Sequence, residues 1–211
     1  HFFVQDNTSR ELLNSINFSA VTVSGDTRFD RVSRILSQEN TLEFIEEFKN
    51  NQFTVVAGST WKEDEELLVN YINNRASENE KFIIAPHQIN RDAILRLQQS
   101  IHKTTLLFSE KEGKKLTDCR VLIIDTIGIL TKIYAAADVA YVGGGLNTGL
   151  HNILEPATFG IPVVFGNHYH KFKEAIDLVA LNGCIPISNQ EEFSDIFIKL
   201  YTDENYRNIT G

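Results

Sequence analysis

The sequence predicts an α/β protein built on a doubly wound parallel sheet. Three observations support this fold class: short apolar runs rich in β-branched residues recur along the chain, stretches with apolar residues at helical spacing separate them, and polar loops follow many of the runs. The runs are continuous rather than alternating, as expected for strands that helices cover on both faces. Strands that alternate with helices form parallel sheets, because each crossover helix returns the chain to the same end.

The predicted elements follow one another from the first apolar run to the last. The predicted strands are 20–24, 53–57, 82–85, 104–108, 120–124, 138–142, 161–165 and 184–187. The predicted helices are 41–50, 63–76, 90–100, 127–136, 152–160, 169–182 and 190–201, each with apolar residues on one helical face. We expect residues 19–201 to form one domain, with 1–18 as a linker and 202–211 as a tail.

The composition excludes several classes of protein. The 211 residues include 20 Lys+Arg and 28 Asp+Glu, a net charge of −8, which argues against a nucleic-acid partner. A hydrophobic share of 42% is too high for a disordered chain, and no apolar run reaches the roughly 20 residues of a membrane-spanning helix. Cys119 and Cys184 have no CxxC spacing and are predicted to be reduced thiols. The absence of methionine indicates a piece of a longer protein.

Ligands of such sheets bind beyond the carboxyl ends of the strands, so the loops that leave the strands carry the candidate residues. The first loop is Ser24–Asp30, in which Asp26 and Thr27 are predicted to cap a helix. Arg28 is out of place in a first helical turn, because the helix dipole favours acids there. An anion beside Arg28 would remove this penalty, and the alternative is a solvated arginine next to an ordinary cap.

The second and third loops leave the strands at 53–57 and 82–85. After Gly58, either Ser59 or Thr60 can cap the next helix while free N–H groups face outward, which suits either a plain helix start or a phosphate cradle. Pro86 fixes the exit of the third loop, where His87 has either a structural or a ligand-binding role.

The fourth loop, 125–130, combines an Asp/Thr cap with Gly128, and its backbone groups can hold a base edge or a phosphate. The fifth loop begins with three glycines at 143–145, and Asn152 opens the next helix with Glu155 one turn inside it. A crevice carboxylate such as Glu155 can accept hydrogen bonds from both hydroxyls of a ribose. In the sixth loop His168 and His170 lack a third ligand of matching character, so we expect no metal site. Together these loops indicate a nucleotide-binding half of an enzyme.

Five segments in order give the chain a specific resemblance. They are SGDTRFDRV (24–32), AGSTWKEDEE (57–66), APHQINR (85–91), DTIGIL (125–130) and VGGGLNTGLHNILEPATFGIPVVFG (142–166). From about residue 20 to residue 182, the chain resembles the C-terminal half of the 3-deoxy-D-manno-octulosonic acid (Kdo) transferases of lipopolysaccharide synthesis.

The resemblance implies one Rossmann-like half of a GT-B glycosyltransferase from a Gram-negative bacterium. In that family the C-terminal half holds the donor CMP-Kdo, and the N-terminal half holds the lipid A precursor, the membrane anchor and a glutamate that acts as the catalytic base. The implied location is the cytoplasmic face of the inner membrane for the full-length protein, with this part soluble. No cofactor or metal is expected besides the substrate CMP-Kdo, because this donor carries its own carboxylate and only one phosphate.

Carried over residue by residue, the resemblance makes Arg28 a catalytic residue that stabilises the charge developing on the leaving CMP phosphate. The chain departs from the family pattern at His87 (usually arginine), Ile129 (usually glutamate), Leu150 (often glycine) and Ile153 (proline). The predicted donor site comprises Ser59, Thr60, Pro86, His87, Ile127, Gly128, Ile129, Gly144, Asn152, Ile153, Leu154 and Glu155.

Two alternatives remain at this point. One is another GT-B enzyme, such as a UDP-sugar transferase or a relative of UDP-N-acetylglucosamine 2-epimerase. The other is a nucleotide-sensing module without catalysis. Under the favoured hypothesis, the chain binds CMP weakly and transfers nothing by itself.

Overall fold

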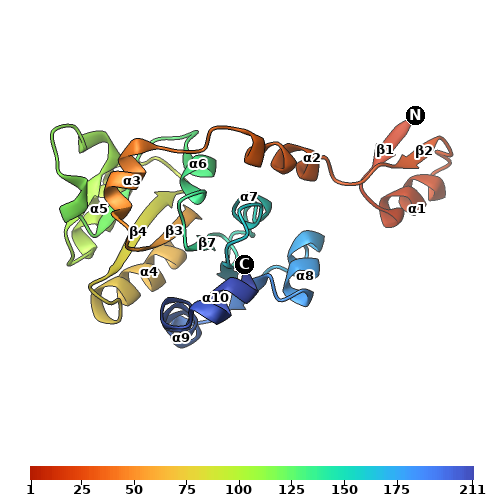
Figure 1. Cartoon of the computed structure of the whole chain (residues 1–211). Coiled ribbons are helices and arrows are strands. Elements are labelled where there is room, and N and C mark those ends of the chain that lie inside the picture. Colours follow the sequence, from red (N-terminus) through yellow and green to blue (C-terminus); the bar gives the residue numbers. More distant parts are fainter. The chain divides into compact units, whose positions relative to one another are not determined.

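The structure is a computed structural model that describes all 211 residues and divides into two compact units, His1–Glu39 and Asn40–Gly211. In the smaller unit, β1 (Phe2–Val4) pairs in parallel with β2 (Val21–Val23), and α1 (Asn7–Ser15) joins them. α2 (Thr27–Ser33) and a short 3-10 turn (Ile35–Ser37) complete this unit (Figure 1).

The larger unit is a seven-stranded parallel sheet of order β5-β6-β4-β3-β7-β8-β9. This confirms the predicted fold class. The strands are β3 (Phe53–Thr60), β4 (Glu80–Pro86), β5 (Thr105–Leu107), β6 (Val121–Ile123), β7 (Val139–Val142), β8 (Val163–Gly166) and β9 (Cys184–Ile187). The helices are α3 (Glu43–Lys49), α4 (Lys62–Asn74), α5 (Arg91–Ser100), α6 (Leu130–Tyr134), α7 (Leu154–Ala157), α8 (Lys173–Ala180), α9 (Gln190–Thr202) and α10 (Glu204–Thr210).

The core consists of two clusters, one on each face of the sheet. Strand residues alternate between them: Val56 and Ile83 belong to one cluster, and Val55 and Phe82 to the other. On the first face the strands pack against α3, α6 and α8, and on the second face against α4, α5 and α9. Because both faces are covered, the strands need no polar face, which explains their continuous apolar runs.

The predicted linker and tail differ from the structure. Residues 1–18 contain β1 and α1, the compact units divide between Glu39 and Asn40, and residues 204–210 form α10. These elements are short, and β1 gains its stability from pairing with β2, a contact that local sequence does not reveal. The run at 20–24 therefore forms a strand as predicted, but in a two-stranded sheet of its own.

α6 and α7 are shorter than the predicted 127–136 and 152–160. Gly128 has a φ of +91°, which no right-handed helix accommodates, so α6 begins only at Leu130. The Asn152 side chain accepts a hydrogen bond from the Leu154 N–H, which fixes the start of α7. In both cases the residues before the helix, 127–129 and 152–153, remain in loops at the carboxyl end of the sheet. None of the ten α-helices has the length and hydropathy that crossing a bilayer requires.

Candidate functional site

The topological switch point of the sheet lies between β3 and β7. The chain leaves β3 towards α4 on one face of the sheet, and leaves β7 towards the opposite face, where Ile153 packs just before α7. The two connections therefore run to opposite faces of the sheet, and open α/β sheets bind ligands in the crevice outside such a switch point. The Gly143 N–H donates to the Gly58 carbonyl at 3.0 Å, and the His87 N–H donates to the Thr60 carbonyl at 2.9 Å. The loops at 58–60, 86–88 and 143–149 therefore lie together at the carboxyl end of the sheet.

Asp64 joins the two sides of the switch point. Its buried carboxylate accepts hydrogen bonds from the Trp61 N–H and the Gly144 N–H, each at 2.9 Å, and from the Tyr141 hydroxyl at 2.6 Å. Burial raises the pKa of Asp64, while these hydrogen bonds act in the opposite direction. A single side chain on α4 thus fixes the start of its own helix and the glycine loop after β7.

Two glycines make this close approach possible. A Cβ on Gly143 would lie 2.3 Å from the Ser59 carbonyl oxygen and 2.7 Å from Asp64 Oδ2. A Cβ on Gly58 would lie 1.9 Å from the Tyr134 hydroxyl. No side chain fits at either position, so both glycines serve close packing rather than flexibility.

The loops after β3 and β4 meet the segment before α7 through three stacked rings. Trp61 and His151 are nearly coplanar, with an interplanar angle of 12°, and Trp61 Nε1 donates to His151 Nε2 at 2.9 Å. The His87 ring stacks on both, with centroids 4.6 Å from Trp61 and 4.3 Å from His151. The ring of His87, which replaces the arginine usual in the resembled family, therefore has a stacking role in this structure.

Glu155 lies in the first turn of α7 and reaches α6. Its two carboxylate oxygens accept hydrogen bonds from the Thr131 hydroxyl at 2.6 Å and from the Asn152 amide at 3.0 Å. Because Thr131 follows directly on the loop at 127–129, the structure brings Glu155 close to the predicted nucleotide-contact loop. These hydrogen bonds orient the carboxylate.

The other predicted donor-site residues differ in how far they are exposed. Ile127 is 82% exposed, and Gly128 is also exposed, so both are accessible at the crevice rim. Ile153 and Leu154 are buried, which leaves only their backbone groups to act on a ligand. The remaining members are Ser59 and Pro86, which are half-buried, Thr60 and Gly144, which are buried, and Ile129, which is half-buried at the start of α6.

Two predicted helix caps at the site are wrong. Neither Ser59 nor Thr60 caps α4: Ser59 has a φ of +55° within the β3 irregularity, and the Thr60 hydroxyl donates to Glu65. The N–H of Trp61, the residue directly before α4, donates to Asp64 instead. Asp125 does not cap α6, because its carboxylate accepts from the Ser109 N–H at 2.9 Å. At α4 the partners are acids of the first helical turn, and at Asp125 the partner is a residue 16 positions away in the chain.

Arg28 belongs to the smaller unit and is paired there. Asp26 caps α2 as predicted, and its carboxylate accepts hydrogen bonds from the Arg28 N–H at 2.9 Å and from Arg28 Nε at 2.8 Å. The hydrogen bond from Arg28 lowers the pKa of Asp26. The anion expected beside Arg28 is therefore the carboxylate of Asp26. A catalytic role for Arg28 is an expectation from the family resemblance alone.

Sequence reasoning missed several residues of the crevice: Trp61, Asp64, Thr131, Tyr141 and His151. Asp64 stands in an acidic run that suits a helix start by itself, so nothing local marks it as the acid that turns inward. One signal was available for His151, because it directly precedes Asn152 in the motif that carries the resemblance.

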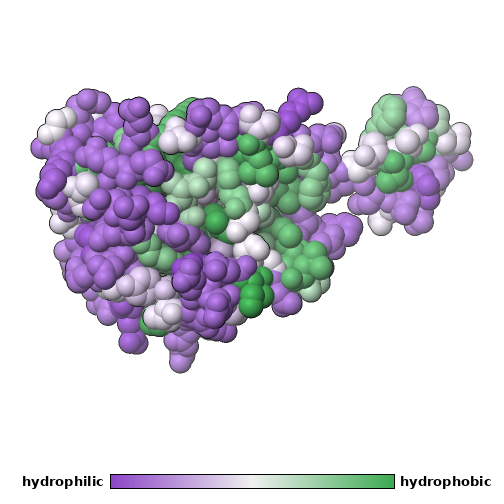
Figure 2. Space-filling view, viewed as in Figure 1, coloured by the Kyte–Doolittle hydropathy of each residue, from purple (hydrophilic) through white to green (hydrophobic).

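The surface near the crevice is partly apolar. Figure 2 shows polar residues over much of this view of the larger unit, with apolar residues gathered around α7 and α8. Large apolar side chains that are exposed in the larger unit include Ile127, Ile176 and Leu181. A cavity of about 760 Å³ lies between α4 and α5 and shares Thr60, Trp61, Pro86 and Gln88 with the crevice loops. No residue of the glycine loop or of α7 lines this cavity.

No family model matches the chain. Among curated proteins, a 3-deoxy-D-manno-octulosonic acid transferase of Rickettsia bellii is 27% identical over 212 residues, which cover 98% of this chain and 50% of that protein. A bifunctional glycosyltransferase/methyltransferase of Fusobacterium nucleatum is 30% identical over 71% of this chain and 24% of its own length. The chain thus spans about half the length, or less, of these curated relatives.

Solved structures agree with these relatives. The C-terminal CMP-Kdo binding domain of WaaA from Acinetobacter baumannii is similar with a TM-score of 0.65 and 26% identity, over 78% of this chain and 92% of that domain. The S. aureus MnaA–UDP structure is similar with a TM-score of 0.63 over 97% of this chain and 52% of its own chain, but at 14% identity it supports the fold alone. In sequence and topology the chain is thus similar to the C-terminal half of the Kdo transferases, and it has the fold of a GT-B glycosyltransferase domain.

Proposed function

We propose that this chain is the donor-binding part of a glycosyltransferase that moves Kdo from CMP-Kdo to a lipid A precursor in lipopolysaccharide biosynthesis. One observation carries the proposal. The motif loops assemble at the β3–β7 switch point, in a chain that is 26% identical to a structurally similar CMP-Kdo binding domain.

In this proposal the ribose hydroxyls of the nucleotide donate to Glu155. The base lies near the loop of Ile127, Gly128 and Ile129, and the phosphate lies near the loops that meet at Gly58 and Gly144. Support comes from the hydrogen bond between Thr131 and Glu155, which links the proposed base and ribose positions. The proposed site needs no metal, because a donor with a single phosphate and its own carboxylate requires no diphosphate clamp.

Calorimetric titration of the 211-residue chain with CMP and UDP tests the proposal. The expected result is tighter binding of CMP than of UDP, with no effect of a chelator. The reverse order would favour a UDP-sugar enzyme, and no binding of either nucleotide would contradict the proposed function.

The proposal assigns transfer to the full-length protein at the cytoplasmic face of the inner membrane. The catalytic base and the lipid A precursor site of the resembled family belong to the other half, so this chain alone should bind CMP without transferring Kdo. An assay of sugar transfer with the chain alone and with the full-length protein tests this division. Transfer by the chain alone would contradict it.

Arg28 is proposed to stabilise the charge that builds on the phosphate as the Kdo–phosphate bond breaks. An interaction made mainly in the transition state raises turnover more than affinity. In the full-length enzyme, Arg28→Ala should lower kcat by on the order of a hundredfold, and Arg28→Lys should recover part of this loss. Since Arg28 pairs with Asp26 in this structure, Asp26→Asn is the matched variant that separates catalysis from the local ion pair. A change in KM alone for Arg28→Ala would make Arg28 a ground-state contact.

A further inference from the structure

Trp61 determines which nitrogen of His151 carries a hydrogen. The indole N–H only donates, so the 2.9 Å contact from Trp61 Nε1 requires His151 Nε2 to be the unprotonated acceptor. A ring whose Nε2 accepts is neutral. Burial and the nearby His87 favour this form, because they lower the pKa of His151 against the opposing Asp64 carboxylate. In a neutral ring whose Nε2 accepts, the hydrogen resides on Nδ1.

The Nδ1–H of His151 is an oriented donor without an acceptor in the protein. The hydrogen bond of the His151 side chain is the one through Nε2. No side-chain nitrogen of the half-buried His151 is both buried and without a partner, so its Nδ1 is not buried. The opposite edge of the ring packs on the glycine loop, with Cδ2 3.0 Å from the position of a Cβ on Gly144. The ring is thus fixed on three sides, by Trp61, His87 and Gly144, while Nδ1 reaches solvent.

The neighbourhood of His151 favours an oxyanion of the donor nucleotide. His151 and Glu155 lie at the two ends of one five-residue segment. The proposed function places the ribose at Glu155. The 5′-phosphate next to this ribose is then the nearest strong hydrogen-bond acceptor for His151, at the other end of the segment. A hydrogen bond to a charged acceptor is stronger than one between neutral groups.

Resting on the proposed function, we propose that His151 donates its Nδ1 hydrogen to a phosphate oxygen of the bound CMP moiety, and that Trp61 is a positioning residue that holds His151 in the donating tautomer. The stacked His87 keeps the two rings in place. Neither Trp61 nor His151 belongs to the donor site that the sequence predicts.

The first test is ¹⁵N NMR of the histidine rings in the 211-residue chain. In the unmodified chain, His151 Nδ1 should carry the hydrogen and Nε2 should not. Trp61→Phe keeps a stacking ring but removes the indole donor, so His151 should shift towards the Nε2–H tautomer. A protonated Nε2 in the unmodified chain, or an unchanged tautomer in Trp61→Phe, would overturn the positioning role.

The second test compares binding of CMP and cytidine, which differ by the phosphate alone. His151→Phe keeps the stacked ring and removes the N–H, so CMP affinity should fall about tenfold or more while cytidine affinity stays unchanged. Trp61→Phe should weaken CMP in the same selective way, to a smaller extent. His102→Phe, at an exposed histidine before β5, is the matched control and should change neither affinity.

Equal weakening of CMP and cytidine by His151→Phe, or no weakening of CMP, would overturn the inference while the proposed function stands. Failure of the unmodified chain to bind CMP would overturn both. If His151→Phe does not fold, the unmodified chain decides: CMP should move the His151 Nδ1–H resonance and cytidine should not. Equal movement with both ligands, or none with CMP, would count against the proposal.

Discussion

The two ends of the seven-stranded sheet are each organised around one buried carboxylate. At the carboxyl end, Asp64 accepts two backbone N–H groups and the Tyr141 hydroxyl. At the amino end, where β4 begins, Glu80 accepts the Ser77 N–H at 2.6 Å and the Tyr71 hydroxyl at 2.9 Å. Burial raises the pKa of both acids.

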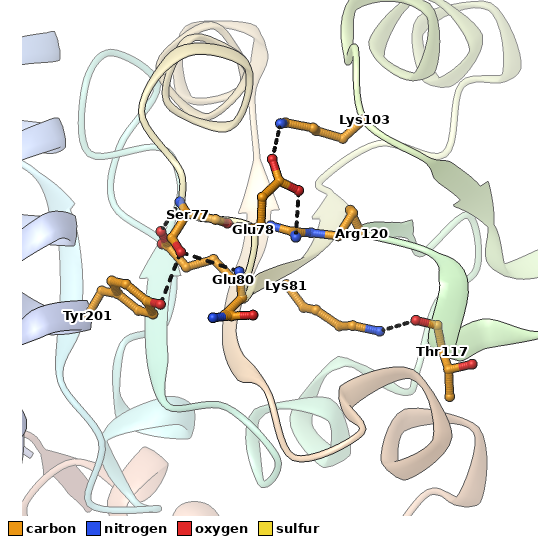
Figure 3. A network of polar contacts seen from close by, with 9 residues as sticks. Ser77, Glu78, Glu80, Lys81, Lys103, Thr117, Arg120 and Tyr201 are labelled. Atoms are coloured by element: carbon orange, nitrogen blue, oxygen red, sulfur yellow. Dashed lines mark hydrogen bonds and ion pairs between the residues drawn. The ribbon is translucent and has the colours of Figure 1, made fainter.

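The surroundings of the two acids differ. Figure 3 shows the amino end, where Glu78 bridges Lys103 and Arg120, and Arg120 also donates to the Ser77 carbonyl. Nearby, Lys81 is buried and donates to the Thr117 carbonyl at 2.9 Å. Polar groups at this end are mostly committed to one another.

At the carboxyl end, the groups around Asp64 lie on loops that leave two different strands, with stacked rings and close-packed glycines beside them. His151 Nδ1, a donor without an acceptor in the protein, also lies at this end of the sheet. A buried acid with a raised pKa therefore does not by itself mark a functional site. The carboxyl end differs from the polar network at the amino end in having a side-chain donor, His151 Nδ1, without an acceptor in the protein.

The largest expected effect is that of a methyl group at Gly143. Gly143→Ala places a Cβ against the Ser59 carbonyl and Asp64, so backbone must move, and we expect a loss of about 3 kcal/mol of stability together with loss of CMP binding. Gly113→Ala is the control, because its Cβ would meet no atom within 4 Å; only its φ of +69° opposes the change, at about 1 kcal/mol. Chemical denaturation of both variants measures the difference. Equal losses would show that the close approach at the crevice has no special cost.

The next effect concerns affinity rather than folding. Glu155→Gln keeps the shape of the side chain but replaces a charged acceptor, so CMP affinity should fall by roughly 1.5–3 kcal/mol. Glu204→Gln is the matched control, because Glu204 is also a first-turn acid, on α10. Calorimetry on the two variants compares them directly. Unchanged CMP binding in Glu155→Gln would reduce Glu155 to a structural link between α6 and α7.

Replacing each buried acid by its amide compares the two ends directly. Asp64→Asn replaces a carboxylate oxygen by an N–H₂ group, which opposes one of the three donors that Asp64 accepts. Glu80→Gln does the same to one of the two donors that Glu80 accepts. We expect each to lower the free energy of unfolding, by about 2 kcal/mol for Asp64→Asn and about 1 kcal/mol for Glu80→Gln. Only Asp64→Asn should also weaken CMP beyond its effect on folding. Weaker CMP binding in a folded Glu80→Gln chain would erase the distinction between the two ends.

The smallest effect is a dependence of stability on pH. The pKa of Asp64 is raised in the folded protein, so the folded state holds the proton more firmly than the unfolded state. The free energy of unfolding of the parent chain, relative to Asp64→Asn, should therefore increase as the pH falls through the raised folded pKa towards the unfolded value of about 4. Denaturation at several pH values measures this difference. A decrease over the same range would mean that the hydrogen bonds to Asp64 outweigh its burial.

Much of the fold was predictable from the sequence, because strands covered on both faces leave continuous apolar runs. All seven strands of the main sheet fall within or beside predicted runs. β1, α1 and α10 were missed, since short elements such as β1, which depends on pairing with β2, leave little local signal. α6 and α7 were predicted too long, since a helical pattern does not reveal the positive φ of Gly128.

The loops that assemble at the switch point were predictable from the sequence, but the side-chain contacts between them were not. Glycine loops after strands indicated the crevice, and the motif order indicated Glu155. The inward turn of Asp64 was hidden, because Glu63, Glu65 and Glu66 beside it suit the same helix start. The contact between Trp61 and His151 joins residues 90 positions apart, which spacing alone does not reveal.

The central claim is that the carboxyl end of the sheet at the β3–β7 switch point binds the donor nucleotide. NMR amide shifts of the 211-residue chain titrated with CMP test it most directly. We predict shifts at 58–60, 86–87, 126–131 and 143–155, with residues 77–81, 101–104 and 117–120 at the amino end unmoved. Shifts confined to the amino end, or to the cavity between α4 and α5, would contradict the account.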